Sequence, residues 1–86
     1  MKTFKDLVFK PHPIGDGLQA IMKFDNGKSV SVVKFKGSRG YPNLWELAVL
    51  DIDGQLDYST PITADVLGNL TEDNVTTAMN KVEVLN

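Results

Sequence analysis

The chain has 86 residues, of which 42% are hydrophobic and 23% are charged, with a formal net charge of −2. This length leaves room for one domain, over residues 1–86, and the composition excludes global disorder. Cysteine is absent, which excludes disulfides, thiolate metal sites and cysteine nucleophiles. The longest apolar run, Leu47–Leu50, is far too short for a membrane helix, and no apolar segment typical of a secretory signal follows the first residues. We therefore expect a cytoplasmic protein without membrane contact.

The charge is unevenly distributed. Residues 1–39 contain eight basic and three acidic side chains, a net charge of +5, whereas residues 40–86 contain one basic and eight acidic side chains, a net charge of −7. Such an asymmetry is typical either of a basic binding face or of two halves that attract one another within one fold. The sequence is compatible with both.

Residues 3–10 are apolar enough to pack against a core, as a helical turn or as an edge strand. Pro11 and Pro13 end any regular structure before them, because proline lacks an N–H and restricts the preceding residue.

Residues 18–35 carry the clearest strand signal. Leu18 to Phe24 alternate with period two, and the run 29–35 is rich in β-branched side chains, as expected of a hairpin. Asn26-Gly27 predicts a two-residue type I′ turn. That turn pairs Asp25 with Lys28, Phe24 with Ser29, Met22 with Ser31, Ala20 with Val33 and Leu18 with Phe35. The predicted core face is Leu18, Ala20, Met22, Phe24, Val33 and Phe35, and the other face carries Gln19, Ile21, Lys23, Val30, Val32 and Lys34.

Residues 37–43 are rich in glycine and other turn formers and predict an exposed loop. Residues 44–52 are strand-like, and Asp53-Gly54 predicts a second hairpin turn. Its register pairs Ile52 with Gln55, Leu50 with Asp57 and Val49 with Tyr58. The fourth strand, over residues 55–59, is short and polar, which is typical of a sheet edge.

Residues 60–63 break the strand, and residues 64–67 are expected to form at most one helical turn. A longer helix follows, with Thr71 as N-cap and one apolar stripe. The stripe comprises Val75, Ala78, Met79 and Val82. The predicted fold is therefore α+β, with a four-stranded antiparallel sheet from two β-hairpins packed against a C-terminal helix.

The chain offers little material for catalysis. Residues 51–54, Asp-Ile-Asp-Gly, invite a calcium-loop interpretation, but Val49 and Thr60 occupy positions that need acidic ligands, and a hairpin turn explains the cluster. His12 has no second imidazole or thiolate with which to hold a metal. No nucleophile elbow or phosphate loop occurs. We predict a protein that is not an enzyme and that uses no cofactor or metal.

The loop between the hairpins is the most suggestive functional feature. Arg39, Tyr41 and Trp45 are of the types enriched at interface hot spots, and they lie on or beside an exposed connection. We predict that these residues, with Lys34 and Lys36, bind a partner protein. The sequence leaves open whether Trp45 belongs to this surface or to the core.

Two other functions fit the sequence. Basic residues on or beside the first hairpin, with aromatic residues nearby, are typical of binders of single-stranded nucleic acid, although the net charge is negative and no known motif is present. These residues are Lys23, Lys28, Lys34, Lys36 and Arg39. A homo-oligomer that pairs through the edge strand is the second alternative.

The C-terminal half also resembles a group of known proteins. The order of residues 45–51 (WELAVLD), 58–63 (YSTPIT), 65–68 (DVLG) and 70–75 (LTEDNV) is similar to that of small uncharacterised accessory proteins of tailed bacteriophages. The resemblance implies a protein of the cytoplasm of an infected bacterium that modulates or inhibits a host protein by binding it. It implies no catalytic residue or ligand.

Overall fold

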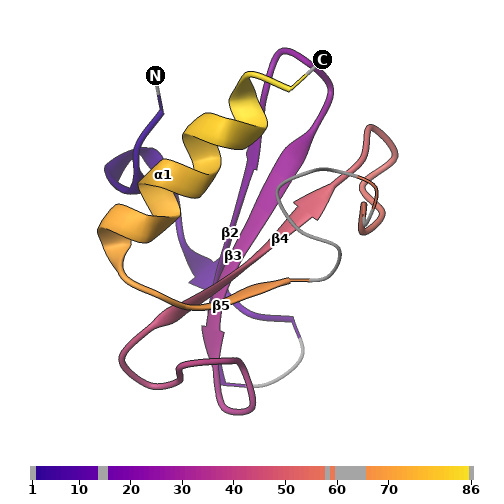
Figure 1. Ribbon diagram of the computed structural model, residues 1–86. Helices are drawn as coiled ribbons and strands as arrows, with labels where there is room; N and C mark the ends of the chain where they lie inside the picture. Colours follow the sequence, from indigo (N-terminus) through magenta and orange to yellow (C-terminus); the bar gives the residue numbers. More distant parts are fainter. Residues whose placement is uncertain (1, 14–15, 58, 60–65, 86) are drawn as a thin grey trace.

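The computed structural model describes residues 2–13, 16–57, 59 and 66–85. A short 3₁₀ helix, η1 (Phe4–Asp6), precedes the strands β1 (Lys10–Pro11), β2 (Gly17–Lys23), β3 (Ser29–Phe35), β4 (Trp45–Leu50) and β5 (Leu67–Leu70), and the helix α1 (Glu72–Glu83) follows them. The strands form one antiparallel sheet in the order β1-β2-β3-β4-β5. Figure 1 shows α1 packed across one face of this sheet.

The predicted class, an antiparallel sheet with a C-terminal helix, is confirmed, but the sheet has five strands instead of four. The predicted fourth strand is wrong in its described part, where Leu56 makes a single bridge to Leu50. The strand beside β4 is instead β5, which begins at Leu67, where a helical turn was expected. Residue 58 of the predicted fourth strand and residues 64–65 of the predicted helical turn lie outside the described residues. The other extra strand is β1, within the segment that ends at the prolines.

In both hairpins the connecting loop is one residue longer than predicted. In the first, Phe24 N donates to Lys28 O (2.8 Å) and Gly27 N donates to Phe24 O (3.1 Å). In the second, Asp51 N donates to Gln55 O (2.8 Å) and Gly54 N donates to Asp51 O (3.0 Å). Each loop therefore has three residues and ends at a glycine with positive φ, +88° at Gly27 and +82° at Gly54. A three-residue loop needs only that one left-handed residue, whereas a type I′ turn needs two.

The longer first loop shifts the register of β3 by one residue. Ala20 pairs with Val32 instead of the predicted Val33, and Met22 pairs with Val30 instead of the predicted Ser31. Because side chains alternate along a strand, this shift exchanges the two faces of β3. Val30 and Val32 are fully buried under α1, and Val33 and Phe35 lie on the face turned away from the helix. The prediction for the face of β2 is confirmed at Ala20 and Phe24, which are buried.

The helix follows its predicted pattern. Asn74 N donates to Thr71 Oγ1 (3.1 Å), and Thr71 N donates to Asn74 Oδ1 (3.2 Å), so Thr71 caps the helix as expected. All four stripe residues are buried. They meet the sheet in one core of Leu7, Ala20, Phe24, Val30, Val32, Trp45, Leu47, Val49, Val75, Ala78, Met79 and Val82.

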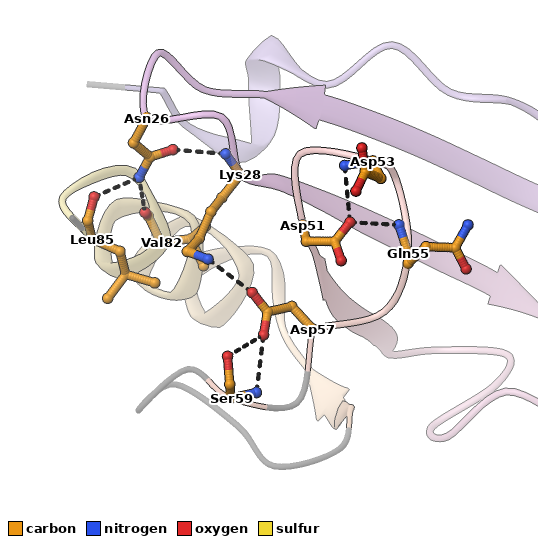
Figure 2. Close-up of polar contacts among 9 residues, drawn as sticks. All are labelled: Asn26, Lys28, Asp51, Asp53, Gln55, Asp57, Ser59, Val82 and Leu85. Atoms are coloured by element: carbon orange, nitrogen blue, oxygen red, sulfur yellow. Dashed lines mark hydrogen bonds and ion pairs between the residues drawn. The ribbon is translucent and has the colours of Figure 1, made fainter.

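The first hairpin loop is attached to the end of the helix. Asn26 Nδ2 donates to Val82 O and to Leu85 O, both at 2.8 Å, and Asn26 Oδ1 accepts from Lys28 N at 3.0 Å (Figure 2). Helix C-termini leave carbonyl groups without intrahelical partners. Asn26 supplies donors for them, which explains why its side chain turns towards α1.

Candidate interaction surface

The loop of residues 36–44 joins β3 to β4 at the end of the sheet opposite the loop that connects β2 and β3 (Figure 1). Ser38 organises its first turn, because its buried hydroxyl donates to Phe35 O at 2.7 Å and accepts from Phe35 N at 3.0 Å. Tyr41 N donates to Ser38 O (3.3 Å), and Leu44 N donates to Gly40 O (2.8 Å). The loop is therefore an ordered series of turns.

Gly40 packs this loop against β5. Its φ is +90°, and a Cβ on Gly40 would lie 2.7 Å from Leu44 Cβ and 3.1 Å from Asn69 Cα. A larger residue would meet both a strained backbone conformation and a steric conflict. Gly40 therefore allows the close approach that holds the loop in place.

Arg39 is exposed but anchored. Its guanidinium donates to Val66 O at 3.1 Å, and its backbone N donates to Glu46 Oε1 at 3.2 Å. Its side chain lies across Gly68, where a Cβ would come within 2.6 Å of Arg39 Cδ. The stem of Arg39 thus covers β5, and the residue is held from two sides.

The structure divides the five predicted binding residues into two groups. Tyr41, at 44% exposure, lies with Arg39 and Lys36 on the surface of the loop. Trp45 is 7% exposed and belongs to the core. Lys34 lies over it, with Nζ 3.9 Å from the centre of the indole ring, which is a cation–π contact. Trp45 is therefore a core residue, which answers the question that the sequence left open.

Trp45 is the centre of an aromatic cluster. Its ring centroid lies 5.2 Å from that of Phe4 and 4.7 Å from that of Phe9. These contacts attach the N-terminal segment to the sheet, so the indole has a packing role at this position.

The basic residues of the first hairpin do not share one face. Strand alternation places Lys23 beside Ile21, on the face turned away from α1, and Lys34 beside Val32 on the face that α1 covers. Lys28 Nζ contacts Asp57 Oδ2 at 2.8 Å (Figure 2). At this point the basic and acidic halves of the chain meet within the fold.

The acidic residues that invited a calcium interpretation serve the second hairpin loop. Asp51 Oδ1 accepts from the backbone N–H groups of Asp53 (2.9 Å) and Gln55 (3.0 Å), as Figure 2 shows. The described part of the chain holds no group of three or more His, Cys, Asp or Glu residues that could bind a metal ion. The ring of His12 stacks near that of Phe35, with centroids 4.4 Å apart.

The outer edge of β2 is a surface that the sequence did not predict. There, Val8 and Ile21 are 72% and 60% exposed and line one groove with Lys10, Pro11 and Gln19. The two prolines that limit β1 were the signal available in the sequence, since proline confines a strand to an edge and shortens it.

Comparison with known proteins provides no relative. The chain matches no protein-family profile, no curated protein and no solved structure. Within the described residues, the structure contains no helix with the length and apolar character needed to cross a membrane.

Proposed function

We propose that this protein is a non-enzymatic protein-binding module that contacts its partner through the loop of residues 36–44. The observation that carries the proposal is Tyr41, a large side chain left 44% exposed on a loop whose backbone is held by successive hydrogen bonds. Tyrosine offers a large contact area for little loss of conformational freedom and is enriched at hot spots.

The order of the loop supports the proposal energetically. Ser38 and Gly40 restrain the turns on either side of Arg39, and Arg39 is anchored to Val66. A surface already held in its bound conformation loses less entropy on association. Lys36 extends the surface with a positive charge, which suits a partner with acidic residues at the rim of the interface.

The resemblance to phage accessory proteins suggests the setting. In this proposal the partner is a protein of the infected bacterium or of the phage, and binding modulates or inhibits it. The loop surface requires no catalytic group for that role.

Site-specific crosslinking tests the proposal. A photo-crosslinking amino acid in place of Tyr41 is compared with the same substitution at Val84, which is also exposed but follows α1. We expect one bacterial protein to crosslink through position 41 and not through position 84. Its affinity for Tyr41→Ala should then be at least about tenfold weaker, which corresponds to about 1.4 kcal/mol. Equal crosslinking at both positions, or unchanged affinity of Tyr41→Ala, would contradict the proposal.

A further inference from the structure

The pairing between β1 and β2 ends before β2 does. Its register comprises Lys10 with Gln19 and Pro11 with Leu18, whereas β2 continues to Lys23. The last part of β2 therefore has β3 as its neighbour on one side, and no described strand follows it on the other.

Two hydrogen bonds show to which side the backbone N–H and C=O groups of β2 point. Phe24 N donates towards β3, to Lys28 O, whereas Gly17 O accepts from His12 N, on the side of β1. Backbone groups alternate in direction along an antiparallel strand. The backbone N–H and C=O groups of Ile21 and Lys23 therefore point away from β3, to the same side as those of Gly17. On that side, no described residue forms a hydrogen bond with these groups.

The N-terminal segment leaves this edge because it is attached elsewhere. Phe9 packs against Trp45, and Phe4 N donates to Thr76 Oγ1 of α1 at 2.9 Å. Figure 1 shows η1 beside the helix. These contacts draw the chain across the core and away from Ile21.

A groove of about 510 Å³ opens where the two segments separate. The exposed side chains of Val8 and Ile21 form apolar parts of its lining. A peptide that added to the edge of β2 would place alternate side chains towards this groove.

The charge of the edge indicates which peptide fits. Lys10 and Lys23 are both exposed, and β1 and β2 contain no acidic residue. A second copy that offered the same edge would bring like charges together, which opposes self-pairing. Acidic side chains would be attracted both to Lys10, in the lining of the groove, and to Lys23, at the end of β2.

The opposite edge of the sheet is less suited to pairing. The register between β4 and β5 is irregular between Trp45 and Leu47, and Asn69 of β5 has a φ of +57°. Such irregularities protect an edge against an added strand.

We infer that the free edge of β2, at Ile21 and Lys23, is a docking site for an extended peptide segment of a partner protein, with apolar residues for the Val8–Ile21 groove and acidic residues for Lys10 and Lys23. This site lies away from the loop of residues 36–44, so it extends the proposed function to a second surface and does not depend on it.

Amide-resolved NMR tests the inference with a defined probe, a short peptide that carries valine at the centre and glutamate at both ends of one face, with threonine at the positions between them. This pattern is needed because Lys10, Ile21 and Lys23 lie on the same face of the sheet. We expect titration to shift the Ile21 and Lys23 amides and to slow their hydrogen exchange, because each N–H gains a carbonyl acceptor. The same peptide with lysine in place of glutamate should leave these amides unchanged. Lys23→Glu should weaken binding of the acidic peptide about fivefold, and Lys36→Glu, on the remote loop, should not weaken it.

Three outcomes would overturn the inference: no shift with millimolar acidic peptide, equal shifts with the basic peptide, or shifts centred on residues 36–44. If the Ile21 and Lys23 amides change with protein concentration alone, the occupant is a second copy of the chain and the inference is also wrong. Spectra of each variant without peptide establish that it is folded. Because the crosslinking at Tyr41 reads a different surface, either proposal can fail without the other.

Discussion

Lys28 Nζ lies 2.8 Å from Asp57 Oδ2, so a lysine of the first hairpin is paired with an aspartate that follows the second hairpin loop. This bond lowers the pKa of Asp57 well below its usual range, and the hydroxyl and backbone N–H of Ser59 lower it further. The pair thus connects the charge asymmetry of the sequence with the stability of the fold.

The first prediction concerns pH. The pKa of Asp57 is lower in the folded protein than in the unfolded chain, where an aspartate has a pKa of about 3.9. As the pH falls, the unfolded state therefore binds the proton first, and the stabilisation that is present above about pH 5 is lost progressively below it. We expect Asp57→Asn to lower stability at neutral pH and to flatten its decline in acid, as measured by urea unfolding across this range.

The control for this experiment is Asp53→Asn, in the adjacent exposed loop. Asp6 adds a smaller dependence of the same sign, because the backbone N–H of Thr3 lowers its pKa. Some decline in acid should therefore persist in Asp57→Asn. A decline identical to that of the wild type would show that the Lys28–Asp57 pair does not govern the acid response.

The second prediction concerns Asn26, which joins the first hairpin loop to the end of α1. Asn26→Ala removes the donors to Val82 O and Leu85 O and leaves these carbonyl groups without this partner. We expect a loss of about 1–3 kcal/mol in the free energy of unfolding. Asn43→Ala, on the exposed loop, should change it by less than about 0.5 kcal/mol. Equal effects of the two substitutions would contradict the role of Asn26.

The third prediction separates the core from the proposed interface. Trp45→Ala should cost about 3–5 kcal/mol because it leaves a cavity beside Phe4 and Phe9. Trp45→Phe should cost less, because it keeps an aromatic ring in the cluster. Tyr41→Ala should leave stability within about 0.5 kcal/mol. Chemical denaturation of the three variants distinguishes these roles, and a large loss for Tyr41→Ala would place Tyr41 among the structural residues.

The fourth prediction tests the length of the second hairpin loop. Gly54 has a φ of +82°, and a Cβ on this residue would have no neighbour within 4 Å, so Gly54→Ala meets backbone strain alone and should cost about 1–2 kcal/mol. Asp53 is not left-handed, and Asp53→Gly should destabilise slightly through the entropy of the unfolded chain. In a two-residue type I′ turn, Asp53→Gly would stabilise instead. Thermal unfolding of both variants therefore reports on the register.

The sequence predicted the candidate surface in part. Arg39, Tyr41 and Lys36 lie on the loop as expected, because glycine and proline mark an exposed connection whatever surrounds it. Trp45 could not be assigned from the sequence, since a tryptophan beside a loop serves equally as an anchor or as core. Its burial depends on Phe4 and Phe9, which approach it from the other end of the chain.

By itself, the sequence determined where the main strands and the helix lie, because alternation, β-branching and an N-cap are local properties that consecutive residues express. Only the tertiary structure decided how they pair. The loop at Asn26 has three residues, and the side-chain amide of Asn26 donates to the carbonyl groups of Val82 and Leu85, which lie 56 and 59 positions away. That choice exchanges the faces of β3, and the packing of Phe9 on Trp45 leads the chain away from β2 and leaves its edge open. Register and edges depend on contacts between distant residues, which local patterns do not encode.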